Sequence, residues 1–205
     1  MCINYQYGSR PNENGYNYRD FVKHLAPRLP VNDKVFYWQD SLEWRDNHTC
    51  IPYKLFRAIC HWKSPRRQTI VNENNCQDVN DAWSQALDCL TLQGNNNRAN
   101  AIRFALQKLV WNAEHQTGLK GVQVRTASAL LTAWNPDEFG IIDFKVLKVL
   151  QMPESYSVKS YLAFRKTLQE IRERDQTLQY CAFRQIELAL WHYYAIQESG
   201  VREFL

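Results

Sequence analysis

The chain has 205 residues, and 25 Lys and Arg against 21 Asp and Glu give it a formal net charge of +4 at pH 7. This length is sufficient for one domain with its own hydrophobic core and excludes the small folds that need disulfides or metals for stability. The small positive charge is compatible with a polyanionic partner but does not by itself indicate one. Seven Trp, eleven Tyr and nine Phe supply core area, and some of these rings can act as surfaces on which bases stack.

The apolar residues recur at helical spacing along most of the chain. In chain order, this spacing predicts helices over residues 17–29, 53–62, 81–92, 99–115, 124–134, 143–150, 158–174 and 178–197. Asp78 and Asn80 are candidate caps for the third helix, and residues 93–97 predict a turn before the fourth. Only residues 34–38 are compatible with a short strand, so we expect an all-α fold.

The Cys and His residues do not indicate a metal or a cofactor. The five His residues form no ligand pair at helical spacing, and no two Cys residues are spaced as C-x-x-C; the Cys residues are Cys2, Cys50, Cys60, Cys76, Cys89 and Cys181. No apolar run approaches the roughly 18 residues that a membrane span needs. We therefore expect reduced thiols, no metal, no cofactor and no membrane partner, in a protein of the cytoplasm, or of the nucleoid if the source is prokaryotic.

The segment 109–150 contains a predicted helical hairpin. An amphipathic helix is expected to end near Gln116, Gly118 and Gly121 bracket a tight turn, and a second helix is expected to begin near Val124. In such a hairpin the backbone N–H groups of the turn and of the second helix's first turn bind a phosphate oxygen without reading a base. An ordinary helix pair joined by a glycine turn is the alternative.

Two motifs in this segment resemble those of the helix-hairpin-helix (HhH-GPD) superfamily of DNA glycosylases. Residues 119–127, LKGVQVRTA, are similar to the family's hairpin pattern of Leu-Pro-Gly-Val-Gly, two variable residues and Thr-Ala. Residues 135–143, NPDEFGIID, resemble the loop that leads into the family's catalytic aspartate, and the interval from Arg125 to Asp143 also matches. The resemblance implies a single two-lobed, all-α HhH-GPD-like domain over 1–205, with the helix-hairpin-helix at about 108–134 and the aspartate loop at about 135–143.

The resemblance also implies that the partner is duplex DNA. The residues expected to hold its backbone at the hairpin are Lys120, Gly121, Val122, Gln123, Val124, Arg125 and Thr126. A basic helix end at 61–67 is expected to face the minor groove, with Lys63, Arg66 and Arg67 on phosphates and Trp62 stacked on an extruded base. A solvated basic helix end with a buried Trp is the alternative.

Asp143 is the candidate catalytic residue. Cleavage of an N-glycosidic bond builds positive charge on the sugar as the base leaves, so a fixed carboxylate near the sugar stabilises the transition state and can align a water. Asp143 precedes the apolar residues of the helix 143–150, where backbone N–H groups at the N-cap favour an ionised carboxylate. An N-cap with no catalytic role is the alternative.

Two positions depart from the family's pattern. Arg125 stands where strand-cutting members carry a lysine nucleophile, and a guanidinium stays protonated and is a poor nucleophile. The resemblance therefore implies a monofunctional glycosylase, with Lys120 and Lys63 as the other amines that can stand in for the missing lysine. Gln123 replaces a usual glycine, but its backbone N–H is still available to a phosphate.

Three hypotheses follow from the sequence. The first is a monofunctional DNA glycosylase that acts through Asp143. The second is a binding module that uses the hairpin on duplex DNA without chemistry. The third is a structural helical protein whose hairpin contacts another protein.

Overall fold

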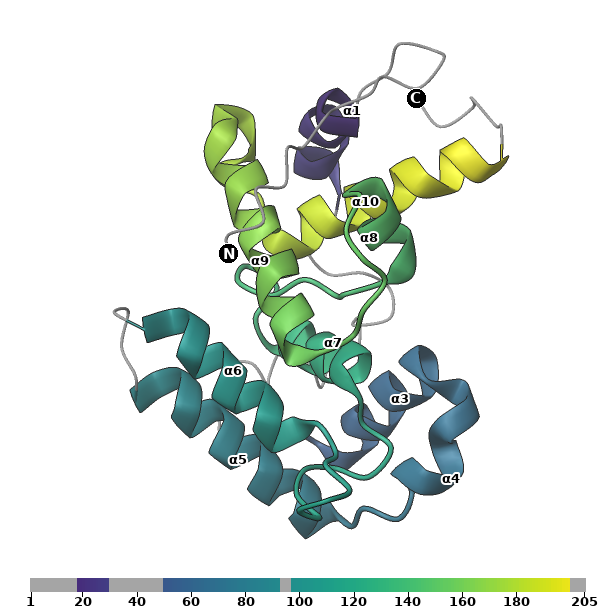
Figure 1. The fold of residues 1–205 in the computed structure, drawn as a ribbon, viewed down its shortest axis with the longest axis vertical. Helices are drawn as coiled ribbons and strands as arrows, with labels where there is room; N and C mark the ends of the chain where they lie inside the picture. The colour runs from purple at the N-terminus through teal and green to yellow at the C-terminus, as the bar shows by residue number, and fades with distance from the viewer. Residues whose placement is uncertain (1–17, 30–49, 93–96, 200–205) are drawn as a thin grey trace.

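The computed structural model describes residues 18–29, 50–92 and 97–199 (Figure 1). Within these ranges the regular secondary structure is helical, which confirms the all-α prediction. The predicted strand at 34–38, most of the turn at 93–97, Cys2 and His48 lie outside the described residues. None of the described helices combines the length and the apolar character that a membrane crossing requires.

The helices follow one another in this order: α1 (Tyr18–Leu25), η1 (Ala26–Arg28), α3 (Tyr53–Lys63), η3 (Pro65–Arg67), α4 (Gln68–Val71), α5 (Cys76–Leu92), α6 (Arg98–Leu109), α7 (Val124–Trp134), α8 (Phe144–Val149), α9 (Val158–Arg174), η5 (Gln176–Leu178) and α10 (Phe183–Ser199). In Figure 1, α3 to α6 form the lower part of the molecule, and α1, α8, α9 and α10 form the upper part. α7 lies between them and packs against α3 and α6.

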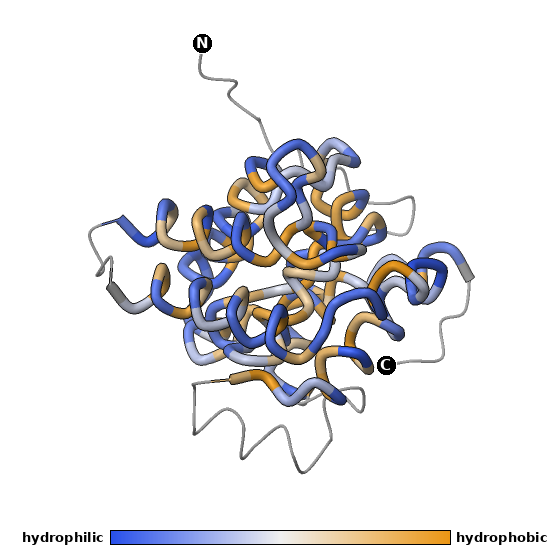
Figure 2. The backbone as a smooth tube through the Cα atoms, turned by 90° about the horizontal axis from the view of Figure 1, so that it is seen from below, coloured by the Kyte–Doolittle hydropathy of each residue, from blue (hydrophilic) through white to orange (hydrophobic). Residues whose placement is uncertain are grey.

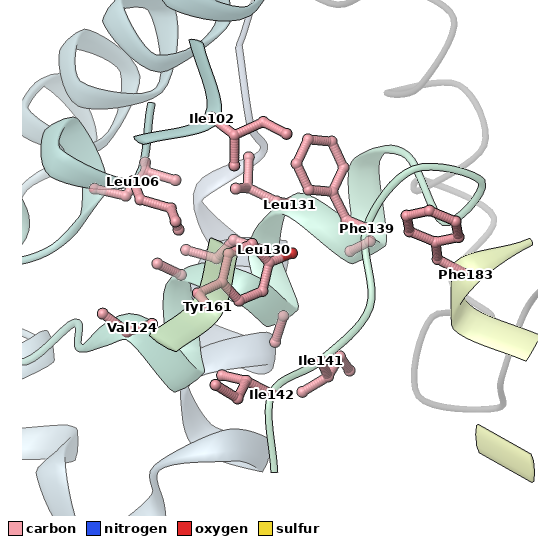
Figure 3. Close-up of a cluster of buried hydrophobic side chains, with 14 of the residues drawn as sticks. Ile102, Leu106, Val124, Leu130, Leu131, Phe139, Ile141, Ile142, Tyr161 and Phe183 are labelled. Atoms are coloured by element: carbon pink, nitrogen blue, oxygen red, sulfur yellow. The ribbon is translucent and has the colours of Figure 1, made fainter. Parts of the chain in front are cut away.

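Among the helices that the structure describes, α7 is the most deeply buried. Apart from Arg125 and Trp134, its residues are buried, and its sequence is rich in Ala, Ser and Thr, whose small side chains let neighbouring helices approach closely. Figure 3 shows Leu130 and Leu131 of α7 among side chains from α6, from the loop that follows α7, and from α9 and α10. Elsewhere apolar and hydrophilic stretches alternate along the tube in Figure 2, as expected for helices with one buried face.

The end of α6 differs from the prediction. The helix ends at Leu109 rather than near Gln116, because the backbone of the next residues bonds to the returning chain instead of continuing the helix. The N–H of Trp111 donates to the carbonyl of Val122 at 3.0 Å, and the N–H of Leu119 donates to that of Leu109 at 3.1 Å. Ala113, which lies within the predicted helix 99–115, is exposed in this turn.

The start of α5 also differs from the prediction. α5 begins at Cys76 and not near residue 81, because Asn75 and Asp78 form a reciprocal capping box. The N–H of Asp78 donates to Asn75 Oδ1 at 2.9 Å, and the N–H of Asn75 donates to Asp78 Oδ2 at 3.0 Å. Asn80 is therefore inside the helix and not at its cap. Similarly, α10 begins at Phe183 rather than 178, after the short η5.

We expect Gly121→Ala to destabilise the fold by about 2 kcal/mol, because Gly121 has a φ of +76° and an added Cβ would lie 3.1 Å from the backbone nitrogen of Val71. Urea denaturation measures this loss. Gly140→Ala is the matched control, since its φ is ordinary and the nearest atom to its Cβ would be the end of the Leu168 side chain, at 2.7 Å, with the nearest backbone atom, the carbonyl oxygen of Phe183, at 3.6 Å. Equal losses for the two variants would contradict a special backbone requirement at Gly121.

Candidate active site

Asp143 is the N-cap of α8, as the sequence predicted. Its backbone is extended, with φ −141° and ψ 150°, and its Oδ1 accepts the backbone N–H of Lys145 at 3.2 Å. The side chain is only 11% exposed. The short helix α8 therefore begins with a carboxylate that is fixed in orientation and largely removed from water.

The other oxygen of this carboxylate faces two cations. Asp143 Oδ2 accepts from Lys63 Nζ at 2.9 Å and from a terminal guanidinium nitrogen of Arg125 at 3.2 Å. Lys63 is the last residue of α3, and Arg125 lies in the first turn of α7. Three segments that are distant in the sequence thus meet at one carboxylate.

The helices that carry these cations are also joined next to the ion pairs. The hydroxyls of Ser64 and Thr126, each one residue beyond a cation, form a hydrogen bond of 2.9 Å. Thr126 is fully buried, and Ser64 is the C-cap of α3. The end of α3 is therefore held against the start of α7 independently of the charges.

Aromatic rings surround the cations. The Arg125 guanidinium lies 4.9 Å from the centroid of the Tyr156 ring, and Lys63 Nζ lies 5.5 Å from that of Trp62. Lys145 Nζ lies 4.1 Å from the ring centroid of Trp191. Each distance is within the range of a cation–π interaction. Sequence reasoning missed Tyr156, because it lies in a loop between α8 and α9 that carries no motif.

Burial and pairing set the protonation of the site. Burial alone would raise the pKa of Asp143, but the attraction and hydrogen bond of Lys63, the N–H of Lys145 and the charge of Arg125 together lower it below its ordinary value. Burial lowers the pKa of Lys63, and Asp143 offsets only part of that shift. Burial also raises the pKa of Tyr156 to about 12, so its hydroxyl is protonated near neutral pH.

Side chains from α6 and α9 hold the start of the loop that leads to Asp143. The carboxylate of Glu138 is paired with Arg98 of α6 and, at 2.8 Å, with Arg165 of α9. Arg172 donates to the carbonyl of Asp137 at 3.1 Å. These bonds fix the first half of the loop to two helices.

The second half of the loop is held by α9 and α10. The hydroxyl of Tyr161 donates to the carbonyl of Gly140 at 3.2 Å, and the N–H of Ile141 donates to the buried carboxylate of Glu187 at 3.4 Å. Glu187 is itself paired with Arg184. The position of Asp143 is therefore determined by contacts along the whole loop.

The predicted hairpin is present as a turn between Val110 and α7. Its tip is held by the side chain of Asn74, which accepts the N–H of Lys120 at 2.8 Å and donates to the carbonyl of Lys120 at 2.9 Å. Gly118 and Gly121 have φ values of +81° and +76°. The two glycines therefore make the turn possible, and Asn74 fixes it.

The hairpin residues differ in what they can offer a ligand. The N–H groups of Lys120 and Val122 are bonded within the protein, the latter to the carbonyl of Leu119 at 3.0 Å. Gln123 is exposed and caps α7 without a side-chain hydrogen bond, so the first amides of α7 lack acceptors within the helix. These amides, from Gln123 to Thr126, are the hairpin donors best placed to meet an anion.

The remaining predicted residues lie at different places. Lys120 Nζ pairs with Glu73 at 3.1 Å, and Arg66 and Arg67 are exposed in η3. Within the described part of the chain, the side chains that contact the Asp143 carboxylate are those of Lys63 and Arg125, not these three. Trp62 is 38% exposed, so the alternative of a buried Trp is wrong.

Across residues 18–29, 50–92 and 97–199, no group of three or more His, Cys, Asp and Glu side chains is arranged as metal ligands would be. Comparison of the chain with protein-family models, curated proteins and solved structures found no match. The side chains of the site itself are an ionised carboxylate, two cations and the surrounding rings.

We expect the pKa of Asp143 in the native protein to lie below that of an unperturbed aspartate, about 3.9, and to rise in Lys63→Met, which removes the nearest cation. A depressed native pKa stabilises the fold above the unfolded-state pKa, and this contribution is lost as the pH falls through the native value. Carboxyl ¹³C NMR titration measures both values. Asp175, whose pKa is lowered by Thr177, is the internal control. An Asp143 pKa that did not move in Lys63→Met would show that Lys63 is not its principal counter-charge.

Proposed function

We propose that this protein is a monofunctional DNA glycosylase of the helix-hairpin-helix type, which binds duplex DNA, extrudes a damaged or modified base and hydrolyses its bond to the sugar with Asp143. The observation that carries the proposal is the Asp143 carboxylate, fixed at the start of α8 and bound by Arg125 from the first turn after the hairpin. The motif resemblance of the segments 119–127 and 135–143 supports it.

In this reaction Asp143 acts as an anion beside a developing cation. The neighbouring positive charges keep its pKa low, so it is ionised at neutral pH. An ionised carboxylate stabilises the positive charge that builds on the sugar as the base departs, and it can align the water that attacks the sugar. The C–N bond breaks and the base leaves with its electrons, while the oxygen of water forms the new bond to the sugar. Water thus supplies a hydroxyl to the sugar, and its remaining proton ends on the departed base.

The two cations have different accessibility. The Arg125 side chain is 36% exposed, whereas that of Lys63 is 9% exposed. A DNA phosphate can therefore draw Arg125 outward while Lys63 remains paired with Asp143. This division supports a role for Arg125 in backbone binding, together with the first amides of α7, and for Lys63 in holding the carboxylate.

The proposal that strand cleavage does not accompany base release follows from the identity of residue 125. Arginine is protonated under all physiological conditions and does not form an imine readily. Of the two lysines considered as substitutes, Lys120 pairs with Glu73 and Lys63 is bound to Asp143. Water is therefore the nucleophile in this proposal, and Trp62, next to Lys63, is the ring on which the extruded base stacks.

We expect Asp143→Asn to reduce base release on the order of 10²- to 10³-fold or more, because it removes the charge that stabilises the transition state. The assay uses duplexes carrying uracil, hypoxanthine, alkylated purines, 8-oxoguanine or modified cytosines, each developed with and without alkali. Asparagine is also a good N-cap, so α8 should remain intact.

Asp175→Asn is the matched control for this experiment. Asp175 is also an N-cap aspartate and accepts the N–H of Thr177 at 2.9 Å, but it caps η5, a different helical segment. Strand cutting without alkali would contradict the monofunctional assignment, and its loss in Lys63→Met would identify the amine responsible. If Asp143→Asn bound every duplex as the wild type does and neither released a base, the non-catalytic binding module would be the better description.

We expect Arg66→Ala and Arg67→Ala each to reduce the slope of log affinity against log salt concentration by about 0.9, because each removes one phosphate contact on duplex DNA. Fluorescence anisotropy with a labelled duplex over a salt series measures the slope. Arg103→Ala, which removes an exposed arginine of α6, is the control and should leave the slope unchanged. Negligible affinity at low salt would instead favour a hairpin that contacts another protein.

A further inference from the structure

The outer face of α3 carries a groove of which the proposed base removal uses only one residue, Trp62. The inner face of the helix is buried through Leu55, Phe56, Ile59 and Cys60. Apart from Lys63, the remaining α3 residues lie on its outer face and line a groove of about 670 Å³ together with Gln68 of α4. These α3 residues are Tyr53, Lys54, Arg57, Ala58, His61 and Trp62. The groove therefore runs along the whole helix, from Tyr53 to the end that carries Lys63.

The charged residues of α3 and of the segment that follows it are all basic. Between Cys50 and Asn72 the chain contains Lys54, Arg57, Lys63, Arg66 and Arg67 but no Asp or Glu. Lys63 is neutralised by Asp143, whereas Lys54 and Arg57 are exposed beside the groove. A surface with this charge attracts a polyanion.

The groove also presents aromatic surface at both ends. Trp62 is 38% exposed at the end next to Lys63. At the other end Tyr53 is fixed by a hydrogen bond from its hydroxyl to the carbonyl of Asn74, at 2.7 Å, and the Arg57 guanidinium lies 6.0 Å from its ring centroid. Along a helix these two rings are separated by about 14 Å, which is enough room for a few nucleotides.

We propose that the outer face of α3 binds an unpaired segment of a nucleic-acid strand, with a base stacked on Trp62 and phosphates paired with Arg57 and Lys54. Aromatic platforms interleaved with cations are the usual means of holding single strands without reading their sequence. An acidic peptide would use the cations but would not need the exposed Trp62 ring. The proposal shares the Trp62 ring with the proposed base removal but goes beyond it. It concerns the binding of an unpaired strand, without any bond being cut.

The chain offers a matched comparison on α6. Phe104 is 37% exposed, almost as much as Trp62, and the Arg103 guanidinium lies 4.9 Å from its ring centroid. The groove beside Phe104, however, is lined by Asp78 and Asp81 as well as by Lys108 and Lys120, and Arg103 lies outside its lining. α6 therefore has the same pairing of an arginine and an aromatic ring, but the two Asp residues of the adjoining groove offset its two Lys residues, whereas the α3 groove is lined by cations and no acidic residue.

The experiment is fluorescence anisotropy of the full chain with labelled oligothymidylate and oligouridylate of equal length, at low and physiological salt. We expect Trp62→Ala and Arg57→Ala each to weaken binding on the order of tenfold. Trp62→Phe, which keeps a ring, should retain most of the affinity. Phe104→Ala and Arg103→Ala should bind as the wild type does, which separates the α3 groove from a general effect of removing exposed rings or charges.

Three results would overturn the proposal. The first is no binding of either oligonucleotide at low salt. The second is an equal loss of affinity in the α3 and α6 variants. The third is displacement of the oligonucleotide by polyglutamate together with indifference to Trp62→Ala, which would assign the groove to an acidic peptide. This experiment measures binding and not base release. A failure of the glycosylase proposal in the earlier assay can therefore be distinguished from a failure of this one.

Discussion

The arrangement of the site depends on the neutralisation of one buried carboxylate. An ionised Asp143 with 11% exposure would be strongly unfavourable without partners, because it has lost most of its hydration. Lys63 from α3 and Arg125 from α7 supply the opposite charge, and the N–H of Lys145 supplies a further hydrogen bond. The requirement to pair this charge therefore brings the start of α8 to the junction of α3 and α7, which the hydrogen bond between Ser64 and Thr126 also holds together.

A second set of contacts, outside the site itself, holds the loop that leads to the carboxylate. Glu138 is bound between α6 and α9, and Gly140 and Ile141 are bound by Tyr161 and Glu187. These contacts lie between the ends of the loop 135–143, so the loop cannot easily change its path without breaking several of them. A functional side chain held in this way keeps its orientation when a ligand competes for one of its partners.

Local signals in the sequence were sufficient for part of this structure. Asp143 was predicted as an N-cap because the apolar residues of α8 follow it directly, and the turn was predicted from Gly118 and Gly121. The predicted end of α6 was wrong because the helical pattern of apolar residues continues beyond Leu109. There the backbone instead forms hydrogen bonds with residues 117–122. The capping box of Asn75 and Asp78 was not predicted, although the sequence contains its signal, two polar residues three positions apart.

Other features of the site required the structure, because they depend on contacts between distant segments. Lys63 precedes Asp143 by 80 residues, and nothing in the basic stretch 61–67 indicates that Lys63 turns inward while its neighbours remain outside. The geometry of α3 explains the difference. Its inner face packs in the core, its last residue reaches the carboxylate, and its outer face keeps Arg57 and Trp62 in solvent. One short helix thus separates a cation that serves the buried carboxylate from those that can meet an external anion, and this separation follows only from the side of the helix on which each residue lies.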